Sequence, residues 1–209
     1  MSESTTPAAP IVGVYGSARL PAGDPRYKKA VAVGAALAGF GLTVATGGYA
    51  GIMEAVSRGA KEAGGEVIGY TVSAWDGLPA NEFVMTQVDS VDLFERLRKF
   101  SKVDLLIALD GGLGTLTEIA VSWNLLQVGA DARPLLLVGE QWQELHNFVR
   151  AELIVAEPDL DVVRLLPDSA TPEEIAATAA ALVGERLGLG APWESQRRPT
   201  GSAPATLAR

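Results

Sequence analysis

The segment DLLIALDGGLGTLTE, residues 104–118, contains the two transitions that decide the fold of this chain. Its residues 105–109 are all apolar, which is typical of a strand that is covered on both faces. A glycine turn follows, and a helix is expected from Thr115 onward. The segment therefore predicts one strand–turn–helix unit of a parallel sheet.

Similar units recur along the chain, because short apolar runs alternate with longer, alanine-rich segments. Strands are expected at residues 11–15, 42–46, 67–70, 104–109, 134–138 and 162–165. Helices are expected near residues 25–39, 51–64, 89–102, 115–128, 141–151 and 172–186. The alternation predicts the α/β class, as a Rossmann-like, doubly wound parallel sheet with helices on both faces.

Composition excludes several kinds of chemistry. The chain has 209 residues, of which 17 are basic and 25 acidic, a net charge of −8 and no cysteine. Without cysteine there is no thiolate nucleophile and no cysteine-ligated metal. The single histidine, His146, is expected on a surface helix and cannot form a metal site alone. The acidic balance argues against nucleic acid as a partner.

The expected organisation is one domain in the cytoplasm. Residues 10–187 are expected to form a single Rossmann-like nucleotide-binding domain, between a disordered tail at 1–9 and a flexible tail at 188–209. The start, MSESTTPAAP, has no basic region and no apolar run, so it does not resemble a secretory signal. The uncharged stretch 30–53 is interrupted by glycines, and we expect no contact with a membrane.

Glycine follows three of the expected strands at the points where they end. The residues concerned are Gly16, Ser17, Gly47, Gly48, Gly51, Gly111, Gly112, Gly114 and Thr115. Carboxyl ends of parallel strands share one edge of the sheet, so the three turns are expected to meet there. Glycine lets backbone N–H groups approach an anion, and the N-terminus of a following helix adds partial positive charge. The alternative is that each glycine only permits a tight turn.

The turns match neither the G-x-G-x-x-G fingerprint nor the P-loop, so no standard NAD or ATP site is expected. The predicted ligand is a nucleotide or another small molecule that carries a phosphate. Glu118 lies one helical turn after Thr115 and would border the same pocket, although Thr-x-x-Glu is also the pattern of a helix capping box. Residues 95–99, ERLRK, are either a cationic part of this site or an ordinary solvated helix face.

Three motifs occur in an order that resembles the LONELY GUY family. They are GVYGSAR at residues 13–19, TGGYAGIMEAVSRGAKEAGGEVIGY at 46–70 and GGLGTLTE at 111–118, and the resemblance extends over about residues 11–150. The resemblance implies a Rossmann-like homodimer that cleaves the N-glycosidic bond of a nucleoside 5′-monophosphate, a cytokinin riboside monophosphate or AMP. The products would be the free base and ribose 5-phosphate, with no metal or redox cofactor.

The resemblance also implies roles for individual residues. Gly111, Gly112, Gly114 and Thr115 would hold the 5′-phosphate, and Glu118 would stabilise the cation formed at the ribose or orient the attacking water. A gap-free count places the family's essential arginine on Glu95 and the following lysine on Arg96. Arg96 is our first choice for this charge and Arg98 the second. Arg98 and Asn124 are also expected to bind the nucleotide or its phosphate, and Asn124 stands where the family tends to carry threonine. Residues 121–128, VSWNLLQV, are expected at the dimer interface.

One departure from the family pattern keeps a second function open. Asp110 stands where the family usually has proline, and a carboxylate beside a phosphate is repulsive by roughly 1–4 kcal/mol at about 4 Å. Asp110 could cap loop amides, turn away or pair with an arginine. The displaced arginine and Asp110 favour a non-catalytic carrier for a phosphate-bearing ligand such as molybdenum cofactor or a nucleotide, and Glu118 favours the hydrolase.

Overall fold

The protein is described here from a computed structural model, which defines residues 9–75, 78–131 and 133–188. The expected domain at 10–187 falls within this range apart from the gaps. The expected tails at 1–9 and 188–209 lie outside the described residues, except for Ala9 and Gly188.

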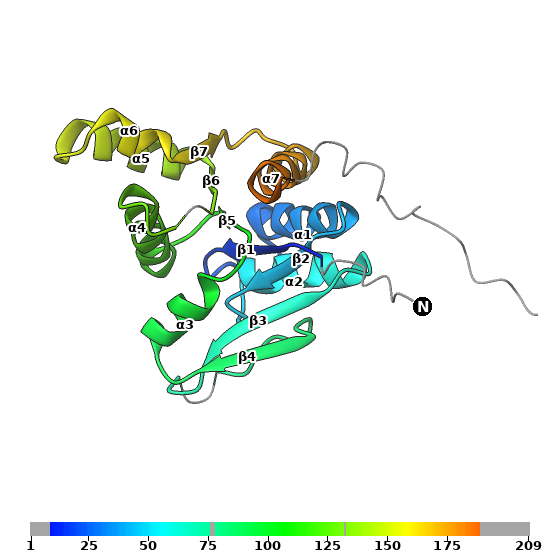
Figure 1. Ribbon diagram of the computed structural model, residues 1–209. Helices are drawn as coiled ribbons and strands as arrows, with labels where there is room; N and C mark the ends of the chain where they lie inside the picture. Colours follow the sequence, from blue (N-terminus) through cyan, green and yellow to red (C-terminus); the bar gives the residue numbers. More distant parts are fainter. Residues whose placement is uncertain (1–8, 76–77, 132, 189–209) are drawn as a thin grey trace, which may run out of the picture.

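A parallel sheet of seven strands forms the centre of the fold (Figure 1). The strands are β1 (Ile11–Tyr15), β2 (Thr43–Thr46), β3 (Val67–Val72), β4 (Thr86–Ser90), β5 (Leu105–Ala108), β6 (Leu135–Val138) and β7 (Val163–Leu166). Their order is β4-β3-β2-β1-β5-β6-β7, and each pair of neighbours is parallel. Every residue of β5 and β6 is buried, which is why their sequences are apolar throughout.

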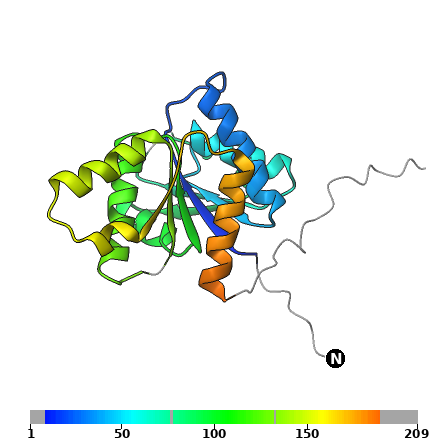
Figure 2. The same cartoon turned by 90° about the horizontal axis from the view of Figure 1, so that it is seen from above.

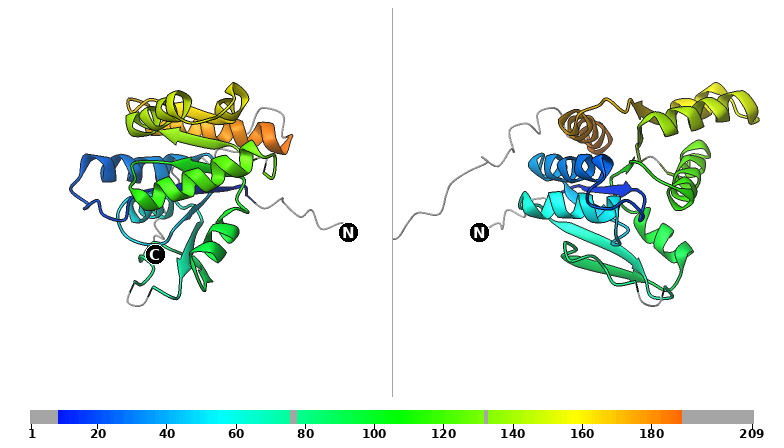
Figure 3. Two further views of the ribbon diagram at one scale, coloured as in Figure 1. Left: turned by 90° about the vertical axis from the view of Figure 1, so that its left-hand side faces the viewer. Right: turned by 180° about the vertical axis from the view of Figure 1, so that it is seen from behind.

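Helices cover both faces of this sheet (Figures 2 and 3). One face carries α1 (Pro25–Gly39), α2 (Ile52–Glu62) and α7 (Pro172–Leu187), and the other carries α3 (Leu93–Phe100), α4 (Leu113–Gln127), α5 (Glu140–Glu152) and α6 (Glu157–Asp161). Side chains of β5 alternate between the two cores: Leu105 and Ile107 join the first, and Leu106 and Ala108 join the second. The predicted fold class is confirmed.

Two elements differ from the sequence prediction. The helix expected from residue 89 begins only at Leu93, because residues 86–90 form the edge strand β4 instead. This strand reads TQVDS and is mostly exposed, so it lacks the apolar pattern that identifies a strand. It is held by parallel pairing with β3 and by side chains, since Thr71 Oγ1 donates to Asp89 and accepts from Gln87. The short helix α6 was not predicted either.

The strand order reverses at β1, which lies between β2 and β5. In open α/β sheets, ligands bind outside the carboxyl ends of the strands beside such a reversal. The turns that follow β1, β2 and β5 all leave the sheet at this edge. Within the described residues, no helix has the length and apolar character that crossing a bilayer requires.

Candidate functional site

Three turns meet at the reversal of strand order: the β1 turn (residues 16–19), the β2 turn (47–51) and the β5 turn (110–115). Ser17 ties the β1 turn to its neighbours, because its amide donates to the Asp110 carbonyl oxygen of the β5 turn at 2.9 Å and its own carbonyl oxygen accepts at 2.8 Å from the amide of Ile52, the residue directly after the β2 turn. The Ser17 side chain accepts a hydrogen bond from the Arg19 amide. The sequence prediction that these turns meet is therefore what the backbone hydrogen bonds show.

Glycines of the β1 and β2 turns are packed against other parts of the chain. A Cβ at Gly16 would overlap the Ile52 side chain, and a Cβ at Gly51 would overlap the Ser17 carbonyl oxygen. Gly51 and Gly48 also have positive φ angles, +70° and +78°, which side chains rarely adopt. At Gly47 a Cβ would overlap the Arg96 guanidinium. Each of these glycines therefore has a structural reason within the protein itself.

The β5 turn is different, because two of its glycines face open space. A Cβ at Gly112 or Gly114 would meet nothing within 4 Å among the described residues, whereas at Gly111 it would overlap the buried Thr115 side chain. Helix α4 begins at Leu113, and its N-cap residue is Gly112, so no side chain of the described residues caps this end of the helix. The first amides of a helix have no partner inside the helix. The β5 turn thus offers donors, partial positive charge and room for an anion.

Arg96 and Glu118 form a buried ion pair beside this turn. Arg96 Nη2 donates to Glu118 Oε1 at 3.1 Å, and the two residues are only 6% and 7% exposed. Among the described residues, Arg96 Nε has no hydrogen-bond partner. Burial raises the pKa of the Glu118 carboxyl from 4.5 to about 7, although the Arg96 charge opposes the rise. Glu118 therefore does not cap its own helix, which was the structural alternative for the Thr-x-x-Glu pattern.

A buried phenol lies near the same carboxylate. Tyr15 Oη and Ser122 Oγ are 3.2 Å apart, and Ser122 follows Glu118 by one helical turn. Burial raises the pKa of the Tyr15 phenol, and the charge on Glu118 adds to the rise. A pair of buried hydroxyl groups, on Tyr15 and Ser122, therefore lies near Glu118.

Two aromatic rings that the sequence analysis missed lie against Arg96. The guanidinium carbon is 5.5 Å from the ring centre of Trp75 and 6.0 Å from that of Tyr49. The two rings are 5.7 Å apart, and Tyr49 Oη accepts a hydrogen bond from the Val72 amide at 2.8 Å. Tyr49 lies inside the β2 turn and could have been noticed there, but no motif points to Trp75.

Asp110 is half-buried at the start of the β5 turn, close to charges on α1. Burial raises the pKa of its carboxyl, and the positive charges of Arg26 and Lys29 oppose the rise, while Asp168 adds to it. Arg26 also pairs with Asp24 at 2.8 Å. Lys29 pairs with Asp168 at 3.7 Å, so both cations near Asp110 already have a carboxylate partner, and Asp110 remains an unfavourable neighbour for a bound phosphate.

Three other residues named from the sequence lie away from the ion pair. Arg98 is exposed and lies about 200° around α3 from Arg96. Glu95, which the gap-free count placed at the family arginine, pairs with Lys99 at 3.0 Å on the surface. Asn124 is exposed and contacts Gln127, about 9 Å along α4 from Glu118. Ligand binding by Arg98 and Asn124 stays a prediction.

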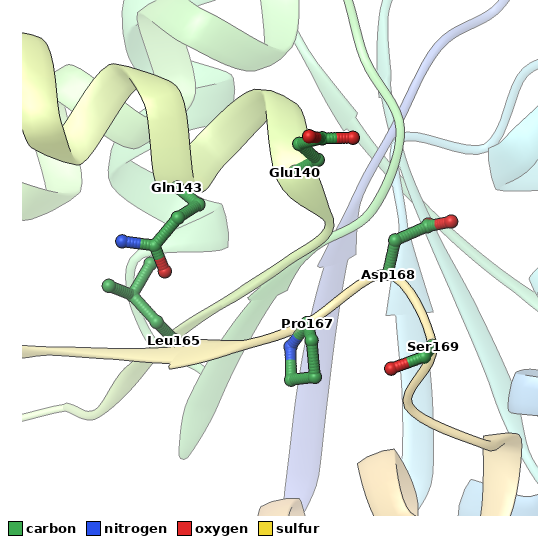
Figure 4. Close-up of a pocket in the computed structure, with 6 residues that line it drawn as sticks. All are labelled: Glu140, Gln143, Leu165, Pro167, Asp168 and Ser169. Carbon is green, nitrogen blue, oxygen red and sulfur yellow. The ribbon is translucent and has the colours of Figure 1, made fainter.

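A separate, shallow pocket lies beyond the β5 turn, between the start of α5 and the residues after β7 (Figure 4). It is lined by Glu140, Gln143, Leu165, Pro167, Asp168 and Ser169. Its two carboxylates, Glu140 and Asp168, make it unsuited to a phosphate. The predicted anion site is therefore the glycine turn itself and not this pocket.

The fold and the turns define a Rossmann-like α/β protein with a candidate ligand site at the reversal of strand order. Comparison with known families then assigns it: the chain belongs to the SLOG cluster4 family, whose model matches residues 9–142. An uncharacterized protein of Archaeoglobus fulgidus is 31% identical over 113 residues, 53% of this chain and 72% of the relative. The more specific assignment to the LONELY GUY family is not confirmed by this match and stays a resemblance of motifs.

Two solved structures show the same fold. The molybdenum cofactor binding protein from Rippkaea orientalis is 24% identical, with a TM-score of 0.67 over 85% of this chain and 99% of that one. The Moco carrier protein from Chlamydomonas reinhardtii is 23% identical, with a TM-score of 0.63 over 85% of this chain and 99% of that one. At these identities the likeness is one of fold.

Proposed function

We propose that this protein is a non-catalytic binding or carrier protein for a small phosphate-bearing ligand, such as a nucleotide or molybdenum cofactor. The observation that carries the proposal is the open β5 turn. Gly112 and Gly114 have no packing neighbour that requires glycine, while uncapped amides begin α4 beside them. A phosphate would accept charge-assisted hydrogen bonds from these amides.

Two further features support a carrier. Arg96 Nε is buried and has no hydrogen-bond partner in the described chain, and the positive charge of Arg96 favours an anion bound nearby. The solved structures that share the fold include a molybdenum cofactor binding protein and a Moco carrier protein. A carrier must hold its ligand and release it unchanged. The charge of Arg96 and the amides of the β5 turn can bind a phosphate without any chemical reaction.

The test uses alanine substitutions at two glycines that are equally free of neighbours. Gly112→Ala adds a methyl group that meets nothing in the described chain but occupies the space above the turn amides. We expect it to weaken the binding of inorganic phosphate and AMP by about tenfold or more in isothermal titration calorimetry. Gly39→Ala, at the C-terminal end of α1, is the matched control and should bind both ligands as the wild type does. Equal affinities for both variants would contradict phosphate binding at the β5 turn.

Hydrolysis of a nucleoside 5′-monophosphate is a second candidate, because Arg96 contacts Glu118 as the LONELY GUY resemblance anticipates. In that reaction the C1′–N bond breaks, a water oxygen bonds to C1′, and the base leaves with the electron pair and takes up a proton. Glu118 would stabilise the cation or orient the water. Release of ribose 5-phosphate from AMP or N6-prenylated AMP, lost in Glu118→Gln, would establish it; no release alongside phosphate binding would leave the carrier function.

The homodimer implied by the resemblance also stays a prediction. Val121, on α4, and Val128, directly after the last residue of α4, lie at the ends of the stretch expected in the interface, and both are exposed. Light scattering after size-exclusion chromatography measures the mass of the assembly. A Val128→Asp variant should reduce that mass to the monomer's if this stretch is the interface.

A further inference from the structure

We propose that Trp75 is the platform on which a flat heterocyclic ring of the ligand stacks. The inference rests on the proposed function, because it assigns the part of the ligand that lies opposite the phosphate. The class of ligand is then a phosphate ester that carries a planar, nitrogen-containing heterocycle, as purine nucleotides and pterin phosphates do.

The position of Trp75 in the fold brings it to the ligand edge of the sheet. Trp75 follows β3 by three residues. Its amide donates to the carbonyl oxygen of Val72, which is the last residue of that strand. Because β3 is parallel to β2, its carboxyl end shares an edge with the β2 turn. A hydrogen bond to the neighbouring strand also holds this part of the chain, since the Ser73 amide donates to the carbonyl oxygen of Ser90 at the end of β4.

One side of the Trp75 ring rests on parts of the protein that are held in place. Tyr49, fixed by its hydrogen bond with Val72, lies 5.7 Å from it between ring centres. The Arg96 guanidinium lies 5.5 Å from it and is held in turn by Glu118. A ring supported in this way loses little freedom when a ligand stacks on it.

The rest of the Trp75 ring is open to solvent. Trp75 is 37% exposed, whereas Tyr49 and Arg96 beneath it are nearly inaccessible. It belongs to neither hydrophobic cluster of the described residues, so the two cores do not account for a tryptophan at this position. A large, supported and partly exposed ring is the usual requirement for stacking a base.

Arg96 connects the stacking surface with the phosphate turn. Its guanidinium contacts Trp75 on one side and Glu118 on the other. Glu118 lies one helical turn after Thr115, in the helix that the β5 turn begins. A ligand with its ring on Trp75 and its phosphate at the β5 turn would therefore place its middle part over the ion pair.

The experiment compares ligands with and without a ring on variants of Trp75. The probes are AMP, neopterin monophosphate and ribose 5-phosphate, and Kd is measured by isothermal titration calorimetry. For Trp75→Ala we expect Kd for a ring-bearing probe to rise about 5- to 100-fold, with Kd for ribose 5-phosphate unchanged within about twofold. Trp75→Phe should retain most of the affinity. Phe148→Ala, which removes another exposed ring, on α5, is the matched control and should change neither.

The outcomes separate this inference from the proposed function. Loss of affinity for AMP alone identifies a purine ring, and loss for neopterin monophosphate alone identifies a pterin; either supports stacking on Trp75. If ribose 5-phosphate binds and Trp75→Ala leaves all affinities unchanged, the stacking is wrong while phosphate binding stands. If none of the probes binds, both proposals are overturned.

Discussion

Glycines of the β2 turn lie against neighbouring atoms, whereas Gly112 and Gly114 of the β5 turn have open space where a side chain would be. Gly47 makes room for Arg96, and Gly51 lies against the β1 turn with a φ of +70°. At the β5 turn, neither open glycine has a positive φ. The β2 turn therefore needs its glycines in order to fold, whereas the β5 turn needs glycine at Gly111 but not at Gly112 or Gly114.

The difference shows how two turns with similar sequences can serve one site in different ways. The β2 turn lies behind the candidate site. Gly47 leaves room for the Arg96 guanidinium, and Tyr49 packs against the Trp75 ring. The β5 turn leaves its outer surface free. Glycine is therefore a sign of ligand contact only where the protein itself does not fill the space beside it.

The largest expected effect is on the packed turn. Gly51→Ala would combine an unfavourable φ with overlap of the Ser17 carbonyl oxygen, and should lower the free energy of unfolding by about 2–5 kcal/mol. Gly112→Ala should change it by no more than about 0.5 kcal/mol. Urea unfolding followed by circular dichroism measures both. Similar unfolding midpoints for the two variants would remove the distinction between the turns.

The next effect concerns the ion pair that both turns border. The pKa of Glu118 rises from 4.5 to about 7 on folding. At pH values between these two, the folded state therefore holds a proton that the unfolded chain has already released. Stability should therefore fall by about 2–3 kcal/mol as the pH rises through this window. Urea unfolding of wild type and Glu118→Gln from pH 4.5 to 8 isolates this contribution, which the variant should lack.

Gly47→Ala tests the same dependence of stability on the ionisation of Glu118. Its methyl group would displace Arg96, so the pKa of Glu118 should rise further and the loss of stability should extend to higher pH. The carboxyl ¹³C shift of Glu118, followed by NMR against pH, reports this change directly. A titration identical to that of the wild type would mean that Gly47 does not position Arg96.

The smallest effect has the opposite sign. Gly114→Ala lies inside the first turn of α4 with nothing within 4 Å, so alanine should stabilise the protein by about 0.5 kcal/mol through its helix propensity. The same variant should bind phosphate more weakly, because the methyl group covers the turn amides. Gly39→Ala again serves as control. Unchanged phosphate affinity in a stabilised Gly114→Ala would show that the open space is not used.

Much of the fold was accessible from the sequence, because apolar runs such as that of β5 predict buried strands directly. The edge strand β4 was not, since its polar residues are held by backbone pairing that leaves no hydrophobic pattern. His146 was expected on a surface helix but is buried, stacked on Trp123. Its helix α5 contacts α6, the short element that the sequence did not predict, where the Leu160 carbonyl oxygen lies 3.4 Å from His146 Nε2.

For the site, the sequence predicted the residue types better than their partners. Arg96, the first choice for the family's charge, pairs with Glu118, whereas the gap-free count pointed to Glu95; its role toward a ligand stays a prediction. Neighbouring residues on a helix differ by about 100° in direction, so a shift of one position cannot be judged from a count. The packing of Gly47 against Arg96 joins residues far apart in the chain, and no local pattern contains it.

The two hydrogen bonds of Ser17 have a consequence for the rate and strength of binding. They tie the β1 turn to the β5 turn and to the start of α2, so the backbone around the site is already ordered in the free protein. A ligand then loses little affinity to the entropy of ordering a loop. Association should accordingly proceed as a single diffusional step, without a slow conformational phase before it.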